Sequence, residues 1–428
     1  MSWGQASSTD LLYWQRETTI LTSPRPSYET AGAWSGNAVI GGLLAYSCTR
    51  WSNSKGIDSS LCLASTDGIR SKKNPVLQTP AQATGGWRDP APFQEGNSTF
   101  LAFGASLGPR RGAVLLTSFP QVKHIVQPLF TVPRIRGAPD MIECPDVAWL
   151  DENVVVLKLS IMANRSQRHD LFILGLLERN TENSPVFTPL NKSRNLPRCG
   201  GIRPDWEVAV GALRLDCGDL YASQSFKLMP NQQLIYMGWI KDQDTNELYN
   251  GALSFPRHLF FQDDRLFYSF LPNLSKLRTD ERLASLHRST TADESLLVIS
   301  ELPSSRRLEI AIYDFRFRRQ GTPSHFVLDL PGRRIEATLN FDVNAAVISV
   351  YDACEMRVVF TNDNDQNLTI RILIDGSLVE WDIGDGLSAC SHRSYRTLIN
   401  KNSTPAARLS SSSSSLRNIK MCAWRLSA

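Results

Sequence analysis

The chain has 428 residues, which is more than one hydrophobic core usually holds, so two domains are expected. A hydrophobic content of 42% and an aromatic content of 9% exclude an intrinsically disordered chain. The net charge of +4 is small against 46 basic and 42 acidic residues, and no Lys/Arg block predicts nucleic-acid binding. No apolar run reaches the roughly 18 residues of a membrane span. Residues 1–5 lack the basic and apolar regions of a signal peptide.

The eight cysteines contain no Cys-x-x-Cys pair, which disfavours a zinc site, and their spacing predicts no particular disulfide pairing. Six Asn-x-Ser/Thr sequons allow a secreted glycoprotein without demonstrating one.

The first 265 residues have the pattern of β-structure. Short apolar runs recur between turns rich in Gly, Pro, Asp and Asn, and no long amphipathic helix interrupts them. Such spacing predicts an all-β sandwich, barrel or propeller. Four of these runs are 113–116, 154–157, 171–174 and 234–237.

A polar segment follows residue 270, and we interpret residues 271–288 as a linker. Several of the apolar segments beyond it alternate apolar and polar residues, as strands with one solvated face do. These segments are 296–299, 308–313, 346–351 and 368–374. The sequence therefore predicts a β-sandwich as the second domain, residues 289–428.

Two short segments each place a carboxylate close before a proline. Gly85–Pro90 contains Arg88 and Asp89, and Ile142–Asp146 contains Glu143. Glycine lets the backbone approach a ligand, and proline restricts the turn that follows. Two carboxylates on rigid turns are what glycoside hydrolysis requires. Taken alone, each segment is more simply interpreted as a surface turn with a solvated acid. The choice between a surface turn and part of an active site therefore depends on the rest of the sequence.

Trp87–Pro90 resembles the Arg-Asp-Pro motif of glycoside hydrolase family 32, the invertases, inulinases and levanases, and Glu143–Pro145 resembles its Glu-Cys-Pro motif. Other segments resemble further blocks of that family, in the same order, from residue 3 to near the end of the chain. They are Trp3–Ser7 with Asp10–Trp14, Trp34–Ala38, Arg214–Gly218 with Tyr221–Phe226, Gly238–Ile240, Gly251–Arg257 and Ile374–Glu380. The resemblance implies an all-β fold, in which a five-bladed β-propeller over residues 1–270, with an incomplete first blade, precedes the linker and the C-terminal β-sandwich.

The same resemblance implies an enzyme that releases fructose from sucrose, inulin or levan by a retaining double displacement. This chemistry requires no metal and no organic cofactor. The expected partner is a carbohydrate, not a nucleic acid or a membrane, and a homodimer is compatible with the sequence. The full-length form is expected to be secreted or vacuolar.

Site residues follow by matching motifs. Glu143 matches the acid/base, which protonates the leaving oxygen and later activates water. Asp89 matches the transition-state stabiliser, which binds fructose hydroxyls. Arg88 either holds a sugar hydroxyl or forms a structural salt bridge.

Five further residues are candidates for contacting the substrate. Trp3, Trp34 and Trp239 could form a wall on which sugar C–H faces pack, although each could equally belong to a hydrophobic core. Ser35 is a candidate hydroxyl contact. Asp216 is expected either to tune Glu143 or to brace a turn.

The family's nucleophile segment, Trp-Met-Asn-Asp-Pro-Asn-Gly, has no counterpart in the sequence, where Asp89-Pro90 is the only Asp-Pro pair. Because Trp3 matches the block that follows this segment, we interpret the chain as N-terminally truncated, and we expect no measurable sucrose hydrolysis from these 428 residues alone. An in-frame upstream genomic sequence without Asn-Asp-Pro-Asn would contradict that interpretation. The alternative is a catalytically inactive protein that binds fructosides or sucrose.

Overall fold

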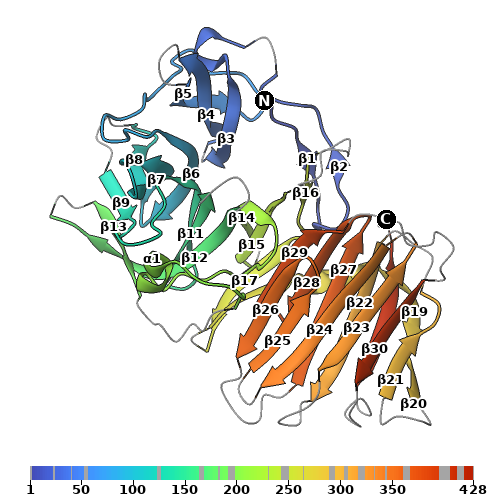
Figure 1. Cartoon of the computed structure of the whole chain (residues 1–428). Helices are drawn as coiled ribbons and strands as arrows, with labels where there is room; N and C mark the ends of the chain where they lie inside the picture. The colour runs from blue at the N-terminus through green and yellow to red at the C-terminus, as the bar shows by residue number, and fades with distance from the viewer. Residues whose placement is uncertain are drawn as a thin grey trace. The chain divides into compact units, whose positions relative to one another are not determined.

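The computed structural model describes residues 2–427, except for 23–24, 40, 53–55, 123–126, 163–167, 182–183, 191–197, 230, 242–249, 264, 289–294, 303–306, 317–322, 332, 343–344, 360–366, 395–404 and 412–418. The described residues are nearly all β-structure, as the sequence predicts (Figure 1). The chain divides into two compact units. The first contains residues 1–195, 202–213 and 222–225, and the second contains residues 196–201, 214–221 and 226–428.

The first unit contains successive antiparallel sheets in which each strand pairs with the next along the chain. The shortest sheet pairs β1 (Ala6–Ser7) with β2 (Gln15–Arg16). The others are β3 (Gly32–Val39), β4 (Leu43–Ser52) and β5 (Gly56–Ser65); β6 (Trp87–Glu95), β7 (Ser98–Ser106), β8 (Gly112–Phe119) and β9 (Gln127–Thr131); and β10 (Ile142–Trp149), β11 (Val155–Met162), β12 (Arg168–Arg179) and β13 (Pro185–Pro189). Two short helices, η1 (Ser27–Glu29) and α1 (Asp205–Ala209), also belong to this unit.

Three of these sheets begin with a strand that carries an irregularity in its pairing. The register shifts between Ala33 and Gly36 in β3, between Arg88 and Ala91 in β6, and between Glu143 and Asp146 in β10. The bulges in β6 and β10 contain a proline, which has no N–H to donate to a ladder and is therefore suited to a bulge. The two segments that the sequence predicts as turns are thus bulges inside strands.

The second unit contains three sheets, and residues 222–225 of their first strand cluster with the first unit. The first sheet runs β14 (Leu220–Leu228), β15 (Gln233–Ile240), β17 (Arg257–Gln262) and β18 (Arg265–Phe270), with β16 (Ala252–Leu253) on β15. The six-stranded sheet has the order β19 (Arg278–Leu283), β31 (Lys420–Leu426), β22 (Arg307–Arg316), β27 (Asn367–Asp375), β28 (Leu378–Ile383) and β29 (Ser388–Arg393). The seven-stranded sheet has the order β20 (Ser285–Arg288), β21 (Ser295–Ile299), β30 (Ala406–Ser411), β23 (Ser324–Leu330), β24 (Arg333–Asp342), β25 (Ala345–Val350) and β26 (Cys354–Val359).

The six- and seven-stranded sheets share one hydrophobic core, as the two layers of a sandwich do (Figure 1). Phe326 of β23 meets Trp381 of β28 edge to face, with ring centroids 5.9 Å apart. The segment 271–288, interpreted from sequence as a linker, contains the 3-10 helix η2 (Pro272–Leu277), β19 and β20. β19 pairs with the last strand β31, because main-chain pairing does not require an apolar sequence. The domain boundaries themselves stay a prediction.

Three disulfides, which the spacing alone did not predict, join Cys48 to Cys62, Cys199 to Cys217, and Cys354 to Cys390. The last one links β26 of one sandwich sheet to β29 of the other. Cys144 and Cys422 are buried thiols. No helix among the described residues is long and apolar enough to cross a membrane.

A buried charge cluster lies in the second unit. Arg257 Nη2 contacts Glu380 Oε2 at 3.1 Å and Arg257 Nη1 contacts Asp382 Oδ2 at 3.8 Å, with all three side chains 0–1% exposed. Burial raises the pKa of Glu380 to about 7, although the charge of Arg257 lowers it. Ser391 Oγ lies 3.2 Å from Glu380 Oε2 and 2.6 Å from Asp216 Oδ2. The Ser391 hydroxyl has one proton, so it can donate to only one of these two carboxyl groups at a time. A protonated Glu380 would donate its own proton to Ser391 Oγ and leave the hydroxyl proton for Asp216.

Glu380 is therefore expected to make stability depend on pH. Between pH 4.5, near the ordinary pKa of a glutamate, and pH 7, Glu380 is ionised in the unfolded chain but keeps its proton in the folded chain. The contribution of Glu380 to stability is therefore complete below pH 4.5 and is lost as the pH rises through about 7. The free energy of unfolding of the wild type, relative to Glu380→Gln, should fall by ~3 kcal/mol across this window. Urea unfolding of both proteins from pH 4.5 to 8 measures it.

His392 produces the opposite trend, because burial lowers its pKa to about 4 and stability is lost as the pH falls from 6.5 to that value. Both proteins retain His392, so its effect cancels in the difference between them. Parallel pH profiles for the wild type and Glu380→Gln would contradict the prediction for Glu380.

Candidate active site

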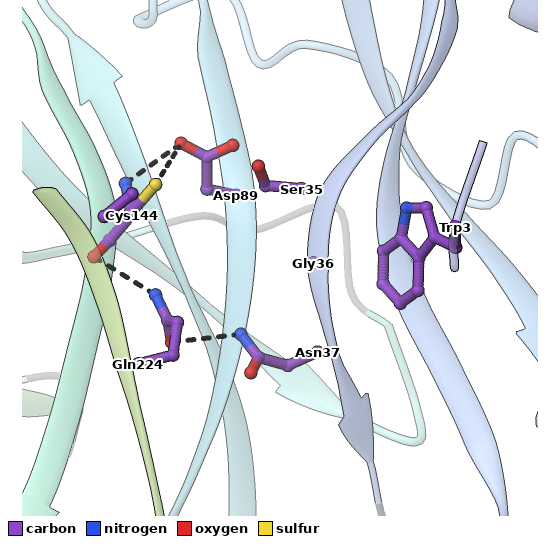
Figure 2. A pocket seen from close by; sticks show the side chains of 8 residues that line it. Trp3, Ser35, Gly36, Asn37, Asp89, Cys144 and Gln224 are labelled. Atoms are coloured by element: carbon purple, nitrogen blue, oxygen red, sulfur yellow. Dashed lines mark hydrogen bonds between the residues drawn. The ribbon is translucent and has the colours of Figure 1, made fainter. Parts of the chain in front are cut away.

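A pocket of about 260 Å³ opens among the bulged strands of the first unit. This volume lies just below the roughly 300–1,000 Å³ of pockets for drug-sized ligands, so a single sugar unit is a suitable occupant. Its lining comes from the N-terminal segment, β3, β6, β10 and the part of β14 that belongs to this unit (Figure 2). The lining residues are Trp3, Ser35, Gly36, Asn37, Asp89, Cys144, Ala222 and Gln224.

The bulges direct residues into this pocket. Asp89, Cys144 and Ala222, each from a different strand, all have left-handed backbone angles, with φ of 62°, 43° and 55°. A bulge turns a side chain out of the regular alternation of its strand and towards a site. Gly104 of β7 makes room for the approach of β10, because a Cβ there would lie 2.3 Å from the carbonyl oxygen of Ile142.

Asp89 is buried and held from two sides. Its Oδ2 accepts a hydrogen bond from the Cys144 backbone N–H at 2.9 Å, and its own N–H donates to Ser47 Oγ at 2.8 Å. Burial raises the pKa of Asp89, more than the Cys144 N–H and the charge of Arg88 lower it. A carboxylate fixed in this way needs no rearrangement to receive a ligand hydroxyl.

Arg88 joins the two acidic segments. Its Nε and Nη2 lie 3.1 Å and 2.8 Å from Glu143 Oε1, and its Nε lies 4.0 Å from Asp89 Oδ2. Burial lowers the pKa of Arg88, but the charges of Glu143 and Asp89 raise this pKa by more than burial lowers it. Arg88 therefore stays a cation. The structure therefore brings Asp89, Arg88 and Glu143 together. Of the three, only Asp89 lines the pocket, and Glu143 stands one residue before the pocket-lining Cys144.

A buried lysine forms a hydrogen bond with the bulge of β10. Lys158 of β11 is fully buried, and its Nζ donates to the Cys144 carbonyl at 2.6 Å and to Ser160 Oγ at 3.3 Å. Ser160 Oγ donates to Asp170 Oδ1 at 2.6 Å, and Asp170 also accepts the backbone N–H groups of Ala222 and Ser223. This chain of bonds ties β10 to β14.

Trp3 and Ser35 line the pocket, and the substrate contacts predicted for them from sequence stay predictions. The Trp3 indole N–H donates to the carbonyl of Trp34 at 3.0 Å, and its ring meets Tyr46 edge to face at 6.1 Å. Trp34 is half-buried and contributes this carbonyl, but it is absent from the pocket lining.

Asp216 and Trp239 belong to the second unit and are also absent from this lining. Asp216 accepts the Gly218 N–H at 2.9 Å and the Ser391 N–H and hydroxyl at 3.1 and 2.6 Å. These contacts favour the alternative that Asp216 braces a turn. The Trp239 indole donates to the Asn250 carbonyl at 3.0 Å and the ring meets Tyr221 edge to face. The roles predicted for both residues in substrate binding stay predictions.

Five pocket residues received no role from sequence reasoning: Gly36, Asn37, Cys144, Ala222 and Gln224. All five lie inside segments that carry the family resemblance. Position could have indicated Gly36, Asn37 and Cys144, because each lies within two residues of Ser35 or Glu143. Ala222 and Gln224 have no predicted site residue so close, and only their segment's family resemblance pointed to them.

Residues 1–269 match the model of the glycosyl hydrolases family 32 N-terminal domain. A raffinose invertase from Escherichia coli is 27% identical over 430 aligned residues, which cover 92% of this chain and 81% of that protein. A sucrose-6-phosphate hydrolase from Escherichia coli is 25% identical over 414 aligned residues, covering 92% of this chain and 80% of that protein.

Solved structures show the same fold. Fructan 1-exohydrolase IIa from Cichorium intybus superposes with a TM-score of 0.75 at 19% identity, covering all of this chain and 89% of that one. A GH32 beta-fructofuranosidase from Bombyx mori gives a TM-score of 0.71 at 20% identity, covering all of this chain and 85% of that one.

Proposed function

Because the chain belongs to glycoside hydrolase family 32 and is a glycosidase of the β-fructofuranosidase type, we propose that its pocket binds the fructosyl unit of sucrose, inulin or levan and releases it as fructose. The observation that carries the proposal is the fixed assembly of Asp89, Arg88 and Glu143, in which Asp89 lines a pocket of sugar size. Acidic and amide side chains around a small pocket suit a ligand made mostly of hydroxyl groups.

We assign the acid/base role to Glu143 and the binding of fructosyl hydroxyls, strongest in the transition state, to Asp89. Arg88 orients Glu143 through Oε1 and keeps a positive charge between the two acids. In the proposed retaining reaction, Glu143 gives its proton to the leaving oxygen and later removes one from water. The reaction also requires a nucleophile, and we assign that role to no residue of the 428.

We further propose that residues 1–270 form a five-bladed propeller and residues 289–428 a sandwich. The successive meanders β3–β5, β6–β9, β10–β13 and β14–β18 support the blades, and the shared core of the two larger sheets supports the sandwich. Three disulfides support a secreted or vacuolar location, since such bonds persist in oxidising compartments.

Isothermal titration of the 428-residue chain with fructose and with sucrose tests the proposed pocket. We expect saturable binding that Asp89→Ala and Trp3→Ala weaken. No detectable heat at millimolar sugar would contradict the proposal. Fructose release, assayed on the same sample, separates hydrolysis from binding alone.

Asp89→Asn is expected to weaken fructose binding by roughly tenfold or more, with little change in stability. Asparagine tolerates the left-handed backbone angle of this position, and its amide oxygen can still accept the Cys144 N–H. The negative charge that we expect to bind the sugar is lost. Thermal unfolding and titration of the same preparation check both parts.

Asp89→Ala is the comparison for that variant. It leaves the buried Cys144 N–H without its acceptor, at a cost of about 1–3 kcal/mol in stability. Equal fructose affinity in the wild type and Asp89→Asn would exclude the proposed role of the charge.

A further inference from the structure

Two carboxamides link the three bulged strands β3, β6 and β10 to β14 at the pocket (Figure 2). Asn37 Nδ2, on β3, donates to the Pro90 carbonyl of β6 at 3.1 Å and to Gln224 Oε1 of β14 at 3.3 Å. Gln224 Nε2 in turn donates to the Cys144 carbonyl of β10 at 3.3 Å. We call these two side chains the amide pair.

The contacts determine which way each amide points. Main-chain carbonyls only accept hydrogen bonds, so the nitrogen of each side chain has to face its carbonyl partner. Gln224 Oε1 is then left to accept from Asn37 Nδ2. Asn37 Oδ1 is the remaining atom, and it forms no hydrogen bond with any other residue that the structure describes.

We propose that Asn37 binds a hydroxyl of the fructosyl unit through Oδ1 and that Gln224 is the positioning residue that holds it there. The inference rests on the proposed function and adds Asn37 to the proposed sugar contacts of Asp89 and Trp3. An oxygen that can only accept selects a hydroxyl donor, which every face of a sugar offers. Because the amide pair also bonds the carbonyls of Pro90 and Cys144, it couples the contact to the bulges that carry Asp89 and Glu143.

Fructose titration of single and double variants tests the coupling. Asn37→Ala should weaken fructose binding roughly tenfold, the size expected for one good hydrogen bond. Gln224→Met has a similar length and no amide, so it should release Asn37 and weaken binding by a similar factor. If the amide pair acts as a unit, the double variant loses no more than either single variant. Multiplied losses would contradict the positioning role of Gln224.

Asn153→Ala is the matched control, because Asn153 is exposed in the turn between β10 and β11 and its side chain lies outside the pocket. Thermal unfolding of each variant separates a folding defect from a binding defect. Asn37→Ser, which retains a hydroxyl acceptor, should bind between the wild type and Asn37→Ala.

A series of mono-deoxyfructoses identifies the contact itself. The deoxyfructose that lacks the contacted hydroxyl should bind the wild type roughly tenfold more weakly than fructose does. Asn37→Ala should bind this deoxyfructose and fructose with equal affinity, because the contact is already absent. If every deoxy sugar loses the same factor in both proteins, Asn37 binds no hydroxyl. If the wild type binds no fructose at all, the proposed function fails and this inference fails with it. If the wild type binds fructose and Asn37→Ala binds it equally, only this inference is wrong.

Discussion

Glu143→Gln is expected to lower fructose release from sucrose by roughly 10²–10⁴-fold, while the affinity for fructose changes little. Glutamine has the shape of glutamate and can still accept the Arg88 hydrogen bonds through its amide oxygen. It cannot donate a proton to the leaving oxygen or take one from water. Turnover should therefore collapse without a matching loss of binding.

The proposed double displacement also requires a nucleophile, so the assay for Glu143→Gln uses a protein that holds one. Placing the family's Asn-Asp-Pro-Asn segment ahead of residue 1 supplies one, and the 428-residue chain serves as the comparison. Glu152→Gln, in the exposed turn after β10, is the matched control and should keep full turnover. Equal rates for Glu143→Gln and the control would refute the assignment of the acid/base.

Arg257→Met is expected to give the largest loss of stability, about 3–5 kcal/mol at pH 8. Arg257 is the cation between Glu380 and Asp382, and none of the three side chains is more than 1% exposed. At pH 8, above the pKa of Glu380 of about 7, removing the guanidinium leaves two buried carboxylates without that cation. Urea unfolding followed by tryptophan fluorescence measures the loss.

Arg307→Met is the control for that experiment. Arg307 pairs with Asp375 at 3.1 Å in the same unit, but both side chains are more than 40% exposed. An exposed pair contributes about 0–1 kcal/mol because water and salt screen it. A loss for Arg257→Met no larger than that for Arg307→Met would show that the buried cluster is not a major source of stability.

Much of the site was accessible from sequence because its acids lie in short segments of unusual composition. Asp89 and Glu143 stand 54 positions apart, one and two residues before a proline that interrupts the regular ladder, and the structure joins them through Arg88. β-Strands were equally accessible, because apolar runs such as 171–174 and 234–237 are short and bounded by turns. Both correspond to strands, β12 and β15.

The amide pair could not be predicted from sequence. Asn37 and Gln224 are 187 residues apart, and only the arrangement of strands brings them into contact. Lys158 was hidden for a different reason. It interrupts the apolar segment Val155–Met162, where a cation usually marks a solvated face, and its burial depends on the Cys144 carbonyl and Ser160. Disulfide pairing likewise depends on which strands become neighbours.

A crystal structure of the chain with fructose bound tests the central claim most directly. We expect one fructose in the pocket, with a hydroxyl within hydrogen-bond distance of an Asp89 carboxylate oxygen and the ring against Trp3. Fructose bound only elsewhere at saturating concentration, or an empty pocket under those conditions, would contradict it.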